Sequence, residues 1–279
     1  MSDPAAAMIQ PTGFHLGLSS EWLVTAVSAN IGAFLNTDVD AALGQPITTL
    51  LSNDAIHDIR NRMALLRGDD AVEHLFQFPL AGAARPFDLA IYRSGNGFGI
   101  DVEPCDERSF GDATGILGGM LARVAPSDDI AQLCQQASSQ LRALTGFQHV
   151  VISAGQEHLG QSMRAGPAPI DVTIASADPD MVVFDRDAAA VPIHVVEAGR
   201  MPQRLTLRAP TATEVALLAA MGASAALVVP LDRNGQCWGQ AACYHGMPRH
   251  VSAERRNVAR LFASIMSLRI EIAELRRGV

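Results

Sequence analysis

Residues 208–249 contain the pattern that most constrains the fold of this chain. The spacing of Thr211 and Glu214 matches a capping box, in which each side chain bonds the other residue's backbone N–H at the start of a helix. Two apolar runs follow, Ala225–Pro230 and Cys237–His245, joined by Asp232-Arg233-Asn234-Gly235. Asn-Gly is a strong signal for a tight hairpin turn. The stretch therefore predicts a helix followed by an antiparallel hairpin.

Residues 9–104 alternate short apolar runs with turns. The runs are FHLGL, WLVTAVS, HLFQFPL, FDLAIYR and GFGIDVEP. Ser94-Gly95-Asn96-Gly97 predicts a hairpin between the last two. A helical region over about 39–67 lies between the second and third runs, with Gly44-Gln45-Pro46 breaking it and Asn53 as a candidate cap for its second part. Strands mixed with helices over about 100 residues are typical of an α+β domain.

Residues 109–146 look helical. Ser127 is a candidate N-cap because Asp128 and Asp129 follow it, which places negative charge at the positive end of the helix dipole. Gly146 is expected to end this helix. A strand is expected over 147–153, whereas the Gly-, Ala- and Pro-rich residues 155–180 carry no pattern that assigns them.

The last segment, about 252–277, reads as one long helix. Apolar residues recur at alternating spacings of 3 and 4, as in a coiled-coil seam. The seam consists of Val258, Leu261, Ile265, Leu268, Ile272 and Leu275. Two interpretations stay open: a helix that packs on its own domain, or an interface between two chains. The second is favoured because the pattern runs nearly to the end of the chain.

Composition excludes several function classes. The net charge of −8 disfavours nucleic-acid binding, which needs clustered positive charge. All 21 basic residues are arginine, so Schiff-base chemistry and the lysines of P-loops and protein kinases are missing. No nucleophile–base pair or pair of carboxylates has a spacing that indicates a catalytic site, so we expect no enzyme activity on these residues.

The cysteines and the termini predict a cytoplasmic protein. The N-terminus lacks a basic start and an apolar core, and no run of about 18 apolar residues predicts a membrane span. Cys105, Cys134, Cys237 and Cys243 form no CxxC pair and are expected to be free and mostly buried thiols. Cys243 and His245 share a strand face but have no partner pair nearby, so no metal site is expected.

Several segments in the right order resemble the phytochrome family. Ile9-Gln10-Pro11-Thr12-Gly13 is similar to the motif that opens the PAS domain of that family, and VSANIGAFLNTDVDAALGQPITTLL is similar to the run that follows it. The later segments that resemble the family's GAF domain are LTGFQHVVI, Met221-Gly222, Trp238-Gly239, Ala242-Cys243-Tyr244-His245 and SLRIE. The resemblance covers nearly the whole chain.

This resemblance implies a PAS domain over 1–108, a GAF domain over 109–251 that begins with the helical region 109–146, and a C-terminal dimerisation or signalling helix over 252–279. Each domain is expected to be α+β, with a central antiparallel sheet flanked by helices. The family also threads its N-terminal segment through a loop of the GAF domain. In this chain Ile9 and the loop 182–207 would make that contact.

The family uses its GAF domain to hold a bilin, and most of the matching positions are substituted in this chain. Arg208 matches an arginine that pairs with a propionate. Glu214 and Tyr244 stand where the family has pocket histidines, and Ser153 stands in place of a tyrosine. Asp171 is a weak match to an aspartate of the family that faces the pyrrole nitrogens. Neither cysteine position that links the bilin is filled, since residues 1–8 hold none and Thr213 occupies the other position.

Two functional hypotheses follow from the resemblance. One is a light-independent signalling and dimerisation module in which covalent bilin attachment is lost and bilin binding is lost or weakened. The alternative is a red/far-red photoreceptor module that binds biliverdin or another tetrapyrrole non-covalently. Both include a homodimer through Leu261, Ile265, Leu268, Ile272 and Leu275, a downstream output domain or partner, and no contact with nucleic acid or membrane.

Overall fold

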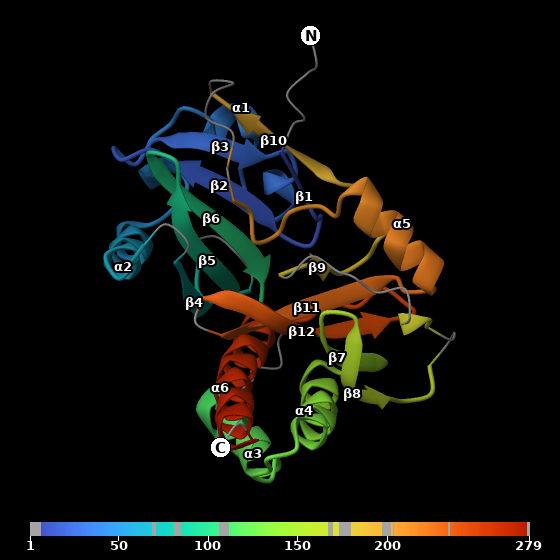
Figure 1. The fold of residues 1–279 in the computed structure, drawn as a ribbon. Helices are drawn as coiled ribbons and strands as arrows, with labels where there is room; N and C mark the ends of the chain where they lie inside the picture. Colours follow the sequence, from blue (N-terminus) through green and yellow to red (C-terminus); the bar gives the residue numbers. More distant parts are fainter. Residues whose placement is uncertain are drawn as a thin grey trace. The chain divides into compact units, whose positions relative to one another are not determined.

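The chain folds into two compact units. The computed structural model describes residues 7–68, 71–80, 85–105, 112–166, 170–172, 180–196, 202, 204–233 and 235–277. The first unit comprises residues 1–109 and 188–209, and the second comprises 110–187 and 210–279. Each contains an antiparallel sheet with helices, as expected (Figure 1). The division differs from the continuous segments expected, because residues 188–209 pack with the first unit and the C-terminal helix packs within the second.

A seven-stranded antiparallel sheet forms the centre of the first unit, in the order β1-β10-β3-β2-β6-β5-β4. Its strands are β1 (Met8–Ile9), β2 (Phe14–Leu18), β3 (Val24–Ser28), β4 (Val72–Phe78), β5 (Phe87–Ser94), β6 (Gly97–Pro104) and β10 (Val191–Val195). The five runs expected in residues 9–104 form β2 to β6. Sequence analysis did not predict β10, which pairs with β3 from a distant segment.

Short helices between β3 and β4 cover one face of this sheet. They are η1 (Ile31–Ala33), α1 (Val39–Ala42), η2 (Ile47–Thr49) and α2 (Asn53–Met63). Ile31 and Ile59 pack there against Phe14, Ile91 and Ile100 of the sheet, and all five are essentially inaccessible to solvent. The predicted cap at Asn53 is wrong by one position: Ser52 accepts the Ala55 N–H, and Asn53 is the first helical residue.

The N-terminal strand β1 is hydrogen-bonded on both edges by the segment 188–209. On one edge Met8 pairs with Pro192, and Ile193 donates its N–H to the Ala7 carbonyl. On the other edge the Gln10 N–H donates to the Leu207 carbonyl at 2.8 Å, and the Ala209 N–H donates to the Met8 carbonyl at 2.9 Å. The expected contact between Ile9 and this loop is therefore present.

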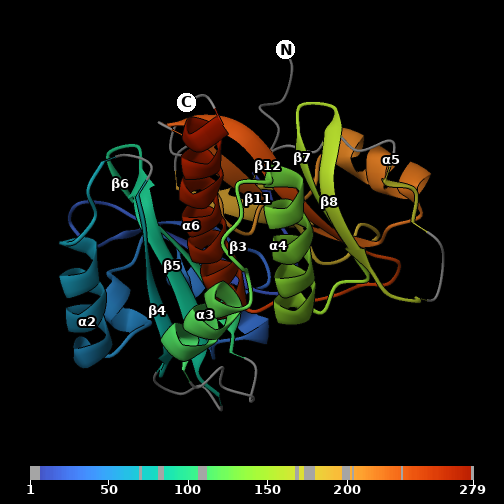
Figure 2. The ribbon, with the colours of Figure 1, turned by 60° about the horizontal axis from the view of Figure 1, so that its bottom comes forward.

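The second unit has a five-stranded antiparallel sheet in the order β8-β7-β12-β11-β9. Its strands are β7 (His149–Ala154), β8 (Glu157–Met163), β9 (Val182–Val183), β11 (Ala225–Arg233) and β12 (Gln236–His245). Its helices are α3 (Ala113–Ala122), α4 (Ile130–Thr145), α5 (Ala212–Met221) and α6 (Ala253–Arg277). Helices α4 and α6 lie side by side on one face of the sheet, and α5 lies on the other (Figures 1 and 2).

The region expected to be helical over 109–146 is two helices within its described part, α3 and α4. Asp129 caps α4 by accepting the Ala131 N–H, so the predicted cap at Ser127 is wrong. Ser127 instead accepts the Asp129 N–H. Gly146 ends α4 in the left-handed region at φ 68°, as expected. None of the helices among the described residues is long and apolar enough to cross a bilayer.

Candidate functional site

The sheet of the second unit has two faces with different neighbours. Strand alternation places Tyr244 on one face of β12 and Cys243 on the other, as expected from the sequence. The Tyr244 face packs against Leu218 and Met221 of α5. The Cys243 thiol faces α4, where it interacts with Thr145. The Tyr244 side, called here the α5 face, is the candidate site because four of the five expected pocket residues belong to the unit that contains it.

Apolar side chains from four strands and α5 fill the centre of the α5 face. The cluster consists of Val151, Val172, Met181, Val183, Leu218, Met221, Ala223, Ala226, Val228, Ala242 and Tyr244. Met181, Val183, Leu218 and Tyr244 have no exposed area. The side chains that the structure describes on this face thus pack against one another as a core.

Tyr244 brings a polar group into this apolar cluster. Its hydroxyl is buried and has no hydrogen-bond partner among the described residues. Burial, with a smaller contribution from neighbouring Cys243, raises the pKa of this hydroxyl. A buried hydroxyl that lacks a partner costs free energy, about 1–3 kcal/mol. The Tyr244 hydroxyl therefore offers a hydrogen bond to any polar molecule that reaches it.

His149 is a second buried polar residue on the α5 face, and sequence analysis missed it. It lies on β7 directly opposite Tyr244, and only 5% of it is exposed. Its Nε2 lies 3.3 Å from the Gln161 Oε1, while its Nδ1 is buried without a partner among the described residues. Burial lowers the pKa of the imidazole. Strand alternation from Ser153 was the signal that could have placed His149 on this face.

Glu214 is held by the helix that it starts. Thr211 accepts the Glu214 N–H at 3.2 Å, and the Glu214 carboxylate accepts the Thr211 N–H at 2.7 Å. Both bonds of the expected capping box are therefore present. Glu214 is buried, at 7% exposure. Its carboxylate has a structural partner, the Thr211 N–H, at the position where the family has a histidine.

Ser153 and Asp171 lie at the margins of the apolar cluster. Ser153 is buried on β7, opposite Gln240 of β12. Asp171 is exposed, and its backbone N–H donates to the Met221 carbonyl at 3.0 Å. Its neighbours Ile170 and Val172 turn their side chains into the cluster. The structure therefore places the Asp171 backbone, rather than its side chain, against α5.

Arg208 belongs to the first unit, with the segment 188–209. Its backbone forms an isolated bridge with Ile9, and its carbonyl accepts the Gln10 side-chain amide at 3.1 Å. Over the described parts of the chain, no group of three or more His, Cys, Asp or Glu side chains is arranged to hold a metal ion. His245 instead bonds the Met247 carbonyl and lies edge-on to Phe147.

Comparison with known proteins identifies the family. A PAS-fold model matches residues 4–105, and a GAF-domain model matches residues 129–270. The chain belongs to the phytochrome family. Phytochrome C of Arabidopsis thaliana is 24% identical over 67% of this chain, and phytochrome B of Sorghum bicolor is 24% identical over 95% of it. The chain spans only 21% and 27% of those two phytochromes.

Solved phytochrome structures share the fold. The chromophore-binding domain of Stigmatella aurantiaca phytochrome P1 is 21% identical, with a TM-score of 0.77 over 95% of each chain. That of an unusual bacteriophytochrome from R. palustris is 20% identical, with a TM-score of 0.79 over 99% of this chain and 98% of that one. The chain is thus a phytochrome-like PAS–GAF module.

The cysteines bear on whether this phytochrome module could attach a bilin covalently. Thr213 stands on α5 where the resemblance places one of the family's linking cysteines. Burial raises the pKa of the Cys134 and Cys243 thiols to about 12, so neither is a ready nucleophile. On the α5 face, the Tyr244 hydroxyl and the His149 Nδ1 are polar atoms that lack partners among the described residues and could bond a polar ligand.

Proposed function

We propose that this module has lost covalent bilin attachment and binds a bilin weakly or not at all, and that it serves as a light-independent signalling and dimerisation module. The observation that carries this proposal is the state of the α5 face. Glu214 is engaged in a capping box, and Tyr244 lies within a close-packed apolar cluster. Buried pyrrole N–H groups and propionates without partners would each cost about 1–3 kcal/mol.

The test is to add biliverdin to the purified protein and to record its absorption spectrum in the dark and after red light. We expect only the spectrum of the free pigment. Stable red/far-red photoconversion would refute the proposal. The double variant Glu214→His, Tyr244→His is the matched comparison, since it restores the residue type expected at both positions. A bound, red-absorbing pigment in that variant alone would assign the loss to these two substitutions.

A second candidate function is non-covalent binding of biliverdin or another tetrapyrrole by a photoreceptor module. The Tyr244 hydroxyl and the His149 Nδ1 favour it, because both are buried, lack partners among the described residues and lie opposite each other on paired strands. Burial of a large apolar ring system would offset part of the desolvation cost. Tyr244→Phe separates the two candidates. It would weaken the binding of a pigment that bonds the hydroxyl, and it would leave signalling by a chromophore-free module unchanged.

The dimerisation part of the proposal is supported by α6, which is apolar on two sides. Its inner side packs Val258, Phe262, Met266 and Ile270 within its own unit, at exposures of 2% or less. Val258, expected in the seam, therefore belongs to this inner side. The outer side, called here the α6 stripe, consists of Leu261, Ile265, Leu268, Ile272 and Leu275. Leu268 and Leu275 are 60% and 66% exposed.

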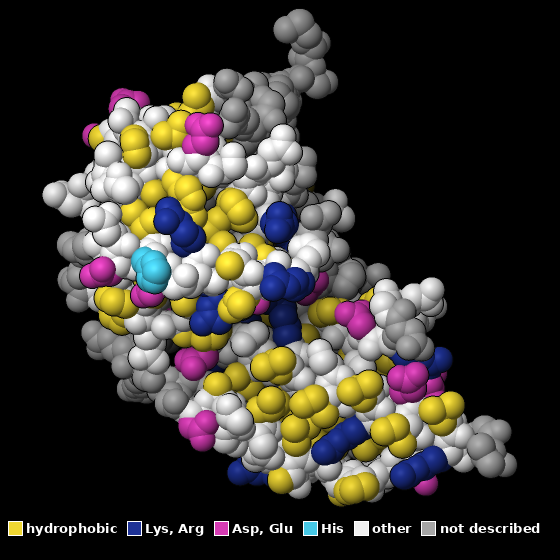
Figure 3. Space-filling view, turned by 90° about the vertical axis from the view of Figure 1, so that its left-hand side faces the viewer, with side chains coloured by type: hydrophobic (Ala, Val, Ile, Leu, Met, Phe, Trp, Pro, Cys, Tyr) yellow, Lys and Arg dark blue, Asp and Glu magenta, His cyan; other side chains and the backbone are white. Residues whose placement is uncertain are grey.

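Contacts with α3 hold α6 in place and leave the stripe uncovered. The Arg269 guanidinium donates to the Leu121 and Val124 carbonyls at 3.2 and 2.9 Å. Figure 3 shows hydrophobic side chains gathered over α6 and α3, with a few arginines between them. Exposed apolar patches of this kind mark interaction surfaces. We infer a two-chain interface along the stripe that relays a signal to a downstream output domain or partner.

Leu268→Glu tests this interface, with dimerisation measured by sedimentation at several protein concentrations. We expect the dimer dissociation constant to rise at least about tenfold, because a carboxylate would be buried between two apolar stripes. Leu65→Glu is the matched control, since Leu65 is an exposed leucine of the first unit. A monomeric wild-type protein, or equal weakening by both variants, would contradict the interface.

A further inference from the structure

We propose that the first unit contains a second ligand site, a polar pocket that binds a small neutral molecule rich in hydroxyl groups, such as a sugar or a polyol. The proposal does not depend on whether the second unit binds a bilin. It rests on a cavity, on a buried histidine of its lining whose Nε2 lacks a partner among the described residues, and on the charge of the described lining.

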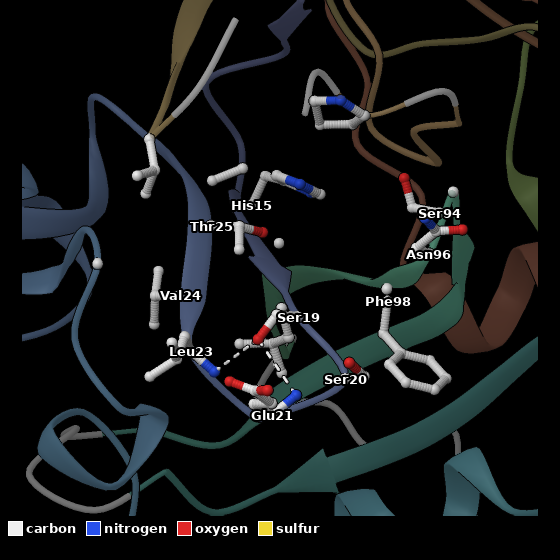
Figure 4. Close-up of a pocket in the computed structure, with 18 residues that line it drawn as sticks. His15, Ser19, Ser20, Glu21, Leu23, Val24, Thr25, Ser94, Asn96 and Phe98 are labelled. Carbon is white, nitrogen blue, oxygen red and sulfur yellow. Dashed lines mark hydrogen bonds between the residues drawn. The ribbon is translucent and has the colours of Figure 1, made fainter. Parts of the chain in front are cut away.

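The pocket lies in the first unit and has a volume of about 760 Å³. Its walls come from the β2–β3 turn, from β3 and from the β5–β6 hairpin, with Val196 and Pro202 at one side. Ser94 and Asn96 face His15 and Thr25 across the cavity in Figure 4. Ligand pockets commonly enclose about 300–1,000 Å³, so the cavity is large enough for a monosaccharide.

His15 lines the pocket, and a hydrogen bond to Asp101 fixes the orientation of its ring. The side chain is fully buried, and its Nδ1 lies 2.7 Å from the Asp101 Oδ1. The other carboxylate oxygen of Asp101 accepts the Thr206 hydroxyl at 2.7 Å and the Thr206 and Leu207 backbone N–H groups. Nδ1 of His15 therefore faces a carboxylate that three further hydrogen bonds hold in place.

This arrangement leaves Nε2 as the ring nitrogen of His15 that another group could bond. Nε2 is buried and has no partner among the described residues. Buried polar atoms are nearly always bonded, so an exception in a residue that lines a cavity indicates a missing partner. A ligand hydroxyl, which can donate and accept, is such a partner.

The pocket walls supply both donors and acceptors. The Ser19 Oγ accepts the Glu21 and Leu23 N–H groups, each at 3.2 Å, which leaves its own proton free to donate (Figure 4). Hydroxyls of Ser20, Thr25 and Ser94 and the amide of Asn96 also line the pocket. A hydroxyl group can donate and accept at once, so a polyol can bond Nε2 as well as the hydroxyl and amide groups of the walls.

The charge of the walls selects against anions. Glu21 is the acidic residue of the described lining, which includes no arginine, and the chain has no lysine. A phosphate or carboxylate ligand would meet the Glu21 carboxylate, and no residue of the described lining offers a cation to pair with it. Phe98 is the aromatic residue of the described lining, so a flat ring that needs two stacking surfaces is also disfavoured.

The test uses saturation-transfer NMR on the full chain with glucose, mannose, ribose, glycerol and myo-inositol at millimolar concentration, and with gluconate and inorganic phosphate as charged probes. Histidine-selective ¹⁵N labelling reports the shift of the His15 Nε2. We expect at least one neutral probe to bind and to move that resonance. Ser94→Trp should weaken its binding at least about tenfold, because the indole would fill the cavity.

Thr48→Trp is the matched control, since Thr48 is exposed in the same unit outside the pocket. It should leave binding unchanged. The proposal is overturned if no neutral probe binds, if binding survives Ser94→Trp, or if the His15 resonance does not respond. Tighter binding of gluconate or phosphate would overturn the ligand class. Failure here would leave the bilin proposal intact, because the biliverdin spectrum is measured independently.

Discussion

Two clusters of buried polar side chains, one in each sheet, differ in how far they are hydrogen-bonded. In the first unit, Asp101 is surrounded by donors from His15, Thr206 and Leu207. In the second unit, the Tyr244 hydroxyl and the His149 Nδ1 lie at an apolar cluster without partners among the described residues. The first set of polar groups therefore stabilises the unit, whereas the second set costs free energy.

The difference shows how a structural polar network can be told from a binding site. A carboxylate that is satisfied by backbone N–H groups needs no ligand. A single leftover atom, such as Nε2 of His15, becomes informative when a cavity adjoins it. On the α5 face the leftover atoms adjoin a packed apolar cluster.

The largest effect is expected for Asp101→Asn. The substitution removes the buried charge that His15, Thr206 and Leu207 bond, and leaves an amide group that must turn a donor toward one of them. We expect a loss of about 3 kcal/mol in the free energy of unfolding, measured by urea denaturation. Asp128→Asn is the control, since Asp128 forms an exposed pair with Arg276 and should cost less than about 1 kcal/mol. Equal losses of stability in Asp101→Asn and Asp128→Asn would contradict a stabilising role of the hydrogen bonds to Asp101.

Tyr244→Phe should act in the opposite direction. Removing a buried hydroxyl that lacks a partner is expected to raise the unfolding free energy by about 1 kcal/mol or to leave it unchanged. A clear loss of stability in Tyr244→Phe would show that the hydroxyl is satisfied in solution.

Glu214→Ala should cost about 1 kcal/mol, measured by thermal unfolding. The substitution leaves the Thr211 N–H without its acceptor at the start of α5. Glu214→Gln keeps an acceptor oxygen at the same position and should retain most of the stability. If both variants were as stable as the wild type, Glu214 would be free for a ligand and the structural assignment of the capping box would fail.

The smallest effect is a pH dependence from His149. Burial lowers the pKa of its imidazole in the folded state, so the unfolded chain binds the proton more readily. Stability from this residue is therefore present above its ordinary pKa of about 6.5 and is lost as the pH falls through the lowered folded value. His149→Gln should flatten the decline between neutral and acidic pH, whereas His57→Gln, at an exposed position on α2, should not.

Sequence alone placed most of the helices and strands, with errors at their ends. Asn53 and Ser127 were chosen as caps, but Ser52 and Asp129 fill those positions. Each region offers several side chains able to cap within two or three residues, and their intrinsic preferences are nearly equal. Packing of the first turn decides which one stands at the helix boundary.

The α6 stripe shows what the spacing of apolar residues predicts about a helix and what it does not. The spacing predicted an apolar seam, and the structure leaves Leu261, Leu268, Ile272 and Leu275 exposed. The sequence did not separate this stripe from the inner one, because Val258 fits the repeat yet packs inside the unit. Only the position of α6 on its own sheet distinguishes the two sides.

The features that depend on neighbours along the chain could be predicted from the sequence. These include the capping box at Thr211 and Glu214, the left-handed Gly146, and the alternation that turns Tyr244 away from Cys243. The tertiary structure decided which distant segments meet. His15 meets Asp101 across 86 residues, β10 joins the first sheet from residues 191–195, and His149 lies opposite Tyr244. Local geometry follows from backbone bonding over a few residues, whereas long-range pairing depends on the packing of the whole unit.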